Sequence, residues 1–381
     1  MKKENIKIPA PLQLVMDDVG WMEGRTPYWQ GFQPTKTGIP RRHVLEDYIM
    51  VNEVGRSINM KINVMFVIGE WDRHHILRHV PYSNRDGARW DSSSFLNIEE
   101  AEKMRDFLNS CEYIEMGIHG LLHEAWDEDG EYIGAEFVTP ENFIKGGKLA
   151  PVPEWYLRKH LDAFMEIYND WGFTQNLRSF SCPGHCLDAW KNGVFPRVLK
   201  DYGVKFWHQH CIENSFVDHD VLMNHKSLIL APWEAYDVNP AKLPTYDPEQ
   251  AGILSSHWPN VLRLDPDKNQ ENLGEWKAFF LRQAETFGIL LSRDIGFAHH
   301  QLLYKNCSTL EESEGRIRID LTNADQMAPS GPRQPLYVSI RNTSVPIRCT
   351  GGILSEYETH KDFKTYKIER TDSGILFLTE G

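Results

Sequence analysis

Seven short apolar runs alternate with segments of helical spacing over most of the chain, and this alternation restricts the fold more than any other feature. The helical segments lie at 41–59, 97–110, 154–171, 188–201 and 274–291. The runs between them cover 12–17, 62–69, 113–118, 177–182, 204–208, 227–231 and 295–300. Because this alternation is typical of parallel βα units, we predict an α/β fold, specifically a distorted (β/α)7-type barrel.

The most distinct helical segment begins at Asn97. This residue suits an N-cap, and Glu100 occupies the capping-box position three residues later. One face of the segment is apolar and carries Ile98, Ala101, Met104 and Leu108.

The pattern changes close to residue 312. Short runs of alternating polarity follow, such as "PLYVSIRN" and "FKTYKIER", separated by Gly, Pro, Asn, Asp and Ser. A chain of 381 residues also exceeds the roughly 250–300 residues at which single cores stop growing. We therefore expect a barrel domain over 1–312 and a small C-terminal antiparallel β domain over 313–381, with no catalytic group in the latter.

Charge and hydropathy exclude several classes of partner. The chain has 41 Lys and Arg against 54 Asp and Glu, a net charge of −13, and no basic run that would follow a phosphate backbone. No apolar stretch approaches the ~20 residues of a membrane span, and the first residues lack the apolar core of a secretion signal. We expect a soluble cytoplasmic protein that binds neither nucleic acid nor membrane. A periplasmic or secreted chain whose signal had been removed would look the same.

The six cysteines form no CxxC pair and no disulfide-like framework, so we expect most of them to be reduced and buried. Cys182 and Cys186 have a spacing that allows metal chelation, but without a second pair we favour packing.

The stretch "LVMDDVGW" (14–21) ends an apolar run with two adjacent carboxylates, Asp17 and Asp18. In α/β folds, active-site groups gather at the carboxyl ends of the strands. An Asp-rich turn or a helix cap would give the same local pattern, so a second signal is needed.

That signal is "EMGIHGLLHEAW", in which His119 and His123 lie four residues apart after another apolar run. If the chain turned helical directly after the strand, both imidazoles would share one face and chelate one ion. A lone histidine pair at this spacing is more often structural, and a metal site would need a third ligand, such as a carboxylate at the end of another strand.

Together, "LVMDDVG" and "EMGIHGLLH" resemble the first two motifs of the NodB-type polysaccharide deacetylases, carbohydrate esterase family 4, and "INVMFVIGEW" resembles the strand between them. The resemblance covers roughly residues 10–305. It implies that Asp18, His119 and His123 bind one divalent metal ion and that Asp17 is the catalytic base. It implies zinc as the ion, with manganese, cobalt, nickel or iron as alternatives.

Later motifs match the family less well. In "RSFSCPGH" only Pro183 aligns, and Ser181 stands where the family has an arginine, which leaves Arg178 as a candidate for that role. The segment "GFAHHQ" resembles the terminal strand whose histidine is the general acid, and His299 aligns best. The resemblance also implies that Trp207 lines the acetyl pocket.

Further polar and aromatic residues follow apolar runs or lie in long loops that would form the rim of a pocket. Exposed tryptophans suit sugar rings, although each residue taken singly is more often structural. The candidates for substrate binding are Glu70, Trp71, His208, His210, Trp233 and His257.

The resemblance, together with these residues, implies a metal-dependent hydrolase that removes an N-acetyl group from an amino sugar or an acetylated oligosaccharide or polysaccharide. One alternative is a hydrolase of another C–N bond or of an ester, such as a cyclic ureide or an acetyl ester, on the same metal site. Another is a non-catalytic carbohydrate-binding relative. A glycoside hydrolase would need two carboxylates flanking the scissile bond, for which adjacent Asp17 and Asp18 are poorly placed.

Overall fold

The computed structural model describes residues 1–23, 41–137, 152–183, 194–208, 252–328, 334–341, 345–371 and 374–381, together with a few isolated short segments. All structural statements below refer to these residues. No helix among them is both long and apolar enough to cross a lipid bilayer.

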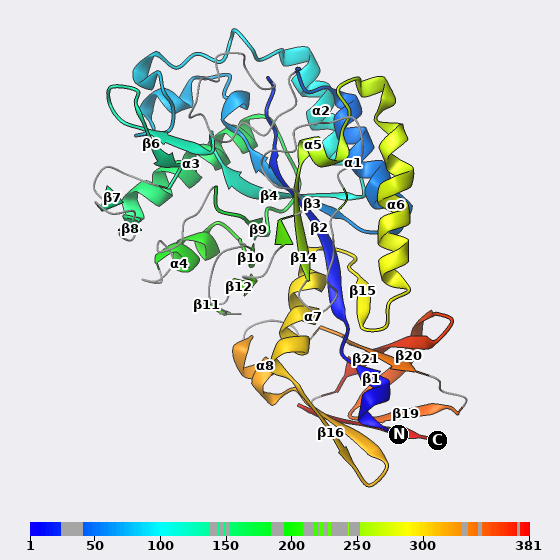
Figure 1. Ribbon diagram of the computed structural model, residues 1–381. Coiled ribbons are helices and arrows are strands. Elements are labelled where there is room, and N and C mark those ends of the chain that lie inside the picture. The colour runs from blue at the N-terminus through cyan, green and yellow to red at the C-terminus, as the bar shows by residue number, and fades with distance from the viewer. Residues whose placement is uncertain are drawn as a thin grey trace.

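A largely parallel sheet forms the centre of the molecule (Figure 1). Its order is β11-β12-β10-β9-β4-β3-β2-β14-β13, with β15 pairing the first residues of β2, and only β11 is antiparallel to its neighbour. The strands are β2 (Ala10–Val19), β3 (Ile62–Val67), β4 (Ile114–Gly120), β9 (Ser179–Phe180), β10 (Phe206–His208), β11 (Val217–Asp218), β12 (Val221–Asn224), β13 (Leu228–Ile229), β14 (Ile253–His257) and β15 (Ile289–Leu291). The parallel α/β class is confirmed, whereas the described residues do not pair β13 with β11 to close a barrel.

The helices of the outer layer follow the sequence pattern with two differences. The helices are α1 (Leu45–Ile58), α2 (Ile98–Ser110), α3 (Glu154–Asp170), α4 (Val194–Asp201), α5 (Trp258–Val261) and α6 (Gln270–Ala284). The helix predicted over 274–291 ends at Ala284, and the last residues of that range form strand β15; the short helix α5 was not predicted. As expected, the Asn97 side chain accepts a hydrogen bond from the Glu100 backbone N–H and caps α2.

The expectation of a strand over 295–300 is wrong. These residues begin helix α7 (Ile295–Cys307), whose N-cap Asp294 accepts a hydrogen bond from the Phe297 N–H. Asp294 is a good N-cap, and that signal outweighs the apolar run that follows it. The last parallel strands along the chain are instead β14 and β15.

The two faces of the sheet pack against different elements. Leu12, Leu14 and Met16 of β2 belong to the core beneath the outer helices, whereas Val15 belongs to a second core that includes Ile295 and Leu302 of α7. Side chains alternate between the faces of a strand, so every second residue of β2 lies on the side of α7. Helix α7 therefore fills part of the inner face of the sheet.

The C-terminal module consists of two four-stranded antiparallel sheets. One has the order β1-β18-β21-β20 and the other β16-β17-β22-β19, with α8 (Thr322–Met327) beside them. The strands are β1 (Ile6–Lys7), β16 (Thr309–Ser313), β17 (Arg316–Asp320), β18 (Leu336–Arg341), β19 (Ile347–Thr350), β20 (Gly352–Thr359), β21 (Phe363–Arg370) and β22 (Ile375–Glu380). Strand β1 comes from the other end of the chain, and α7 lies between the module and the main sheet (Figure 1).

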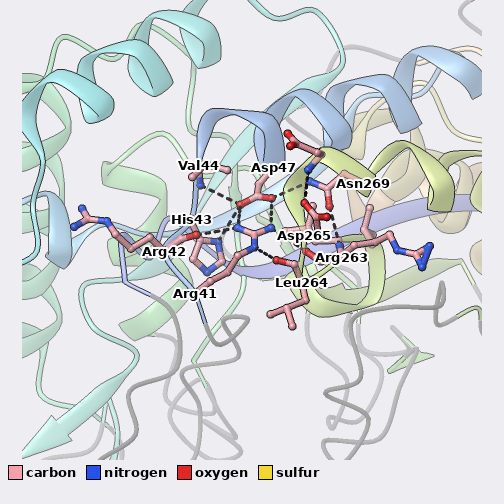
Figure 2. Close-up of polar contacts among 12 residues, drawn as sticks. Arg41, Arg42, His43, Val44, Asp47, Arg263, Leu264, Asp265 and Asn269 are labelled. Atoms are coloured by element: carbon pink, nitrogen blue, oxygen red, sulfur yellow. Dashed lines mark hydrogen bonds and ion pairs between the residues drawn. The ribbon is translucent and has the colours of Figure 1, made fainter.

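A polar cluster ties α1 to the segment that follows β14 (Figure 2). The buried carboxylate of Asp47 accepts hydrogen bonds from both terminal nitrogens of Arg41, at 2.7 Å each, and from the Asn269 side chain at 2.9 Å. Arg41 also donates to the backbone oxygens of Arg263 and Leu264. These bonds fix the chain just beyond α5, which follows the end of β14.

Three of the four described cysteines, Cys111, Cys307 and Cys349, are free, as expected, but they are partly exposed and not buried. Cys182 is the exception, because it is disulfide-bonded. Cys186 and Cys211 lie outside the described residues.

Candidate metal centre

The two adjacent carboxylates lie at the carboxyl end of β2 and point to different partners. Asp17 pairs with His257 across the β2–β14 ladder, and its Oδ2 accepts a hydrogen bond of 2.9 Å from the Ser255 hydroxyl. The register between β2 and β3 shifts between Met16 and Val19, and Asp18 has φ +61°. This irregularity turns the Asp18 side chain away from that of Asp17. A left-handed conformation costs a non-glycine residue roughly 1–2 kcal/mol, which the surrounding structure must offset.

His119 and His123 both face Asp18, but not from a helix. His119 belongs to β4. His123 ends the tight turn that begins at Gly120, and the φ angles of these two residues are +121° for Gly120 and +65° for His123. The chain does not turn helical after this strand, and the two imidazoles are brought together by the turn instead. The two ring centroids are 5.2 Å apart, and the Nε2 atoms of His119 and His123 lie 3.1 and 3.5 Å from Asp18 Oδ1.

These three buried residues fit a divalent metal ion. One ligand atom from each lies within 4.8 Å of the others, and a catalytic zinc site uses three protein ligands of these types. His119 Nδ1 lies 2.8 Å from the Ser181 carbonyl oxygen, which can only accept. The Nδ1 atom of His119 therefore carries a proton, which leaves its Nε2 lone pair to a metal ion on the Asp18 side.

The electrostatics of the trio are those of a strongly coupled cluster. Burial disfavours the carboxylate of Asp18, but His123, His119 and His257 outweigh this and hold the pKa of Asp18 well below its usual range. Burial also disfavours a charged His119 ring, yet the hydrogen bond to Asp18 and the charges of Asp17 and Asp18 raise the pKa of His119 to about 9. For His123 burial prevails over Asp18 and lowers the pKa to about 4. A metal ion would bind both rings through a deprotonated Nε2, so its binding would release the proton that Asp18 holds on His119.

His257 is a further member of the site. It is the last residue of β14, and its Nε2 lies 3.7 Å from Asp18 Oδ2. Its side chain is 18% exposed, whereas those of Asp18, His119 and His123 are at most 5% exposed. His257 therefore marks the side of the cluster that is most accessible to solvent.

Two predicted substrate-binding residues have structural roles. Glu70 is buried, and its Oε2 accepts hydrogen bonds from the backbone N–H groups of Met22 and Glu23, which fixes the chain after β2. Trp71 is fully buried, donates its indole N–H to the Gly20 carbonyl and packs edge-on against Trp171.

Trp207 does not lie on the face of the sheet that carries Asp17. It packs against Phe180 and Phe195 in the core beneath the outer helices, so the expectation that it lines an acetyl pocket is wrong. His208, one residue on, lies with its ring centroid 6.3 Å from that of His299.

Arg178 lies at the opposite end of the sheet from the carboxylates. It pairs with Glu115, the second residue of β4, whereas His119 stands near the end of that strand. Because β4 and β2 are both parallel to β3, their amino ends lie at the same edge, and Arg178 does not take the place of the family's arginine.

His299 belongs to α7 and not to a strand end. Its ring lies 5.2 Å from that of Phe206, the first residue of β10. The structure thus places His257, not His299, at the end of the strand beside Asp17. His210 and Trp233 lie outside the described residues.

Two residues that shape the centre, Ser255 and Glu136, were not predicted from the sequence, and Ser181 was named only because it stands where the family has an arginine. Ser181 binds His119 through its backbone oxygen, so no side-chain signal exists for it. Ser255 and His257 in "ILSSH" alternate along one strand face, and this alternation was a usable signal.

Comparisons with known proteins add little to this geometry. No protein-family model matches the chain, and no curated protein matches it. Among solved structures, the chain resembles a mutant of a CE4 family pseudoenzyme with restored enzymatic activity. The identity is 10%, the match covers 76% of this chain and 68% of the other, and the TM-score is 0.40. A likeness this distant carries no functional argument, so the proposal below rests on the residues of the site.

Proposed function

We propose that this protein is a metal-dependent hydrolase that removes an acyl group, in the first instance the N-acetyl group of an amino sugar or an acetylated saccharide. The observation that carries the proposal is the buried trio Asp18, His119 and His123, with a second carboxylate, Asp17, directly beside it. Binding of a metal alone would not require Asp17, whereas hydrolysis needs a base next to the ion.

A divalent ion held by the trio would act as a Lewis acid on the scissile carbonyl and favour deprotonation of water. Residues of the protein itself would accept and position the protons. The Ser255 hydroxyl holds one oxygen of Asp17, which orients the carboxylate to accept a proton from the attacking water. Ser181 keeps the proton of His119 on Nδ1.

We assign the general acid to His257 in place of His299. His257 ends the strand that pairs with Asp17 and faces the same carboxylate cluster. An acid on the open side of the cluster can protonate a leaving amine, because the departing group leaves toward solvent.

A second candidate is hydrolysis of an acetyl ester or of another C–N bond, such as that of a cyclic ureide. Ser181 stands where the resembling family has an arginine, and Arg178 is engaged with Glu115 at the other end of the sheet. The family's arginine therefore has no counterpart at Arg178, and this difference is the observation that favours the second candidate.

Product analysis tests the two candidates together. The zinc-loaded protein is incubated with acetylated amino sugars, acetylated saccharides and cyclic ureides, and released acetate, ammonia and reducing ends are measured. Acetate with a free amino sugar supports N-deacetylation, acetate from O-acetyl substrates alone supports the esterase, and ammonia or a ring-opened acid supports the ureide hydrolase. New reducing ends without acetate would contradict all three.

A further inference from the structure

The turn that presents His123 is closed around one buried carboxylate. Oε2 of Glu136 accepts hydrogen bonds from three consecutive backbone N–H groups, those of Leu121, Leu122 and His123, at 2.6, 3.3 and 3.2 Å. Successive N–H groups that converge in this way form an anion-binding nest. A Cβ on Gly120 would lie 2.3 Å from the same oxygen, so the glycine provides the space that the carboxylate occupies.

Glu136 is itself fixed from several sides. It is fully buried directly after β6 (Tyr132–Ala135), which pairs with β5 (Glu124–Trp126), and its N–H donates to the His123 carbonyl at 3.0 Å. Its Oε1 lies 2.9 Å from His160 Nδ1, and its backbone oxygen accepts a hydrogen bond from the Tyr156 hydroxyl.

The other nitrogen of His160 is anchored in turn, because Nε2 lies 2.9 Å from the Pro81 carbonyl oxygen. The hydrogen bonds thus run from α3 and the loop at Pro81 through His160 and Glu136 to the backbone of His123. Each step in this chain involves a buried residue with a defined partner.

From this geometry we infer that Glu136 is a positioning residue for the metal centre, holding His123 in the left-handed conformation from which its Nε2 faces Asp18. The inference rests on the proposed metal site and goes beyond it, because Glu136 contacts none of the three ligand side chains in the hydrogen bonds described above. It acts through the backbone of His123, whose φ of +65° is uncommon for a residue other than glycine.

A purely structural role is the competing interpretation, and the chain contains a matched case for it. Asp72 is also fully buried and accepts the backbone N–H groups of Ile76 and Leu77 in a turn where His75 has φ +58°. That turn carries none of the proposed ligands. The Asp72 turn therefore shares with the Glu136 turn a buried carboxylate and a histidine in the left-handed conformation, but it contains no proposed metal ligand.

The test compares Glu136→Ala and Glu136→Gln with Asp72→Ala. Zinc affinity is measured by competition with a chromophoric chelator, and the melting temperature is measured on the metal-free proteins. Groups that orient metal ligands typically contribute 10–100-fold to affinity, so we expect Glu136→Ala to weaken zinc binding by about that factor. Glu136→Gln should lose less, because its amide oxygen still accepts from the three N–H groups. Asp72→Ala should lower the melting temperature and leave zinc affinity unchanged.

The outcomes separate this inference from the proposed function. A wild-type protein that binds no zinc would overturn the metal site and the inference together. If the wild type binds zinc and Glu136→Ala binds it equally well, the inference alone is wrong. Should the alanine variant fail to fold, Glu136→Leu takes its place, because it keeps the bulk of the side chain but cannot accept a hydrogen bond; wild-type affinity in Glu136→Leu would overturn the inference in the same way.

Discussion

The carboxyl and amino ends of the central sheet differ in the side chains that gather there. At the carboxyl end, Asp17, Asp18, His119, His123 and His257 gather in a cluster that includes two non-glycine residues with positive φ. At the amino end, the inner face meets α7, and the ion pair of Glu115 and Arg178 lies at the start of this helix.

This difference assigns the proposed function to the carboxyl end of the sheet and much of its stability to the amino end. Crowded ionisable groups and strained turns destabilise the carboxyl end, whereas burial of α7 stabilises the amino end. Substitutions at the carboxyl end should therefore change metal binding and turnover, and substitutions around α7 should change the free energy of unfolding. The following predictions test that division, from the largest expected effect to the smallest.

Removal of both histidine ligands, in His119→Ala/His123→Ala, should abolish zinc binding. The Lewis acid supplies several kcal/mol of transition-state stabilisation, so kcat/KM should fall by about a thousandfold or more. Zinc content and turnover are measured on the same sample. Stoichiometric zinc in this variant would refute the assignment of the metal site.

Asp17 and Asp18 should respond differently to the same substitution. Asp18→Asn should weaken zinc binding first, because it replaces a ligand carboxylate. Asp17→Asn should keep the zinc and lower kcat by about 10²–10⁴-fold, the usual contribution of a general base. If Asp17→Asn lost the metal while Asp18→Asn retained it, the two roles would be exchanged.

His257→Ala should lower kcat by up to about 10²–10⁴-fold for substrates with poor leaving groups, and less for esters, whose alkoxide needs less help than an amine. His299→Ala is the control from α7 and should lower stability rather than kcat. A kcat loss confined to His299→Ala would return the acid role to that residue and break the division between the two ends.

Leu302→Ala tests the amino end. Leu302 is buried on α7 against Gly252, just before β14, and truncation of such a leucine costs about 2–5 kcal/mol of unfolding free energy. Leu281→Ala on α6 is the control, since Leu281 is 44% exposed. Urea unfolding measures both variants, and kcat/KM of the folded Leu302→Ala protein should match that of the wild type. A loss of turnover without a loss of unfolding free energy would contradict the proposal that α7 stabilises the fold and takes no part in the reaction.

The smallest effect that we expect is a pH dependence of the free energy of unfolding that is caused by Glu115. Burial raises the pKa of Glu115 despite the attraction of Arg178, so the folded state binds this proton more tightly than the unfolded state does. The stability that follows from this is fully present below the unfolded pKa and is lost as pH rises through the folded pKa. Relative to Glu115→Gln, the wild type should therefore lose unfolding free energy as pH rises from the unfolded pKa. A relative gain in urea unfolding would show that Arg178 dominates.

Much of the fold could be predicted from local patterns. The runs at 12–17, 62–69 and 113–118 are strands β2, β3 and β4, and "NIEEAEKMRDFLNS" is helix α2 with its predicted cap. These segments carry a strong period of their own, which tertiary contacts reinforce. The prediction of a strand over 295–300 was wrong because an apolar helix that is buried on both sides has no polar face to reveal its period.

The site was predictable where chemistry is concentrated in adjacent residues and not where it depends on contacts distant in sequence. Asp17, Asp18, His119 and His123 carry their signal locally, and the structure brings them together. Glu136 lies thirteen residues from His123 on a loop, where a buried glutamate and a solvated one look alike. His257 was predicted only as a substrate-binding candidate, and its place beside Asp17 follows from the pairing of β14 with β2.

The pairing of β1 with β18 has a consequence for the order in which the chain can fold. Ile6 pairs with Ile340, and the next strand, β2, lies between β3 and the late strands β14 and β15. At ~5–20 residues per second, synthesis would delay the partner of β1 by roughly 15–70 s. Until β14 and β15 are synthesised, β2 has one neighbour, β3, and its other edge is available for pairing with another chain. We expect the nascent protein to depend on chaperones during this interval, and recombinant yield to rise when chaperones are co-expressed.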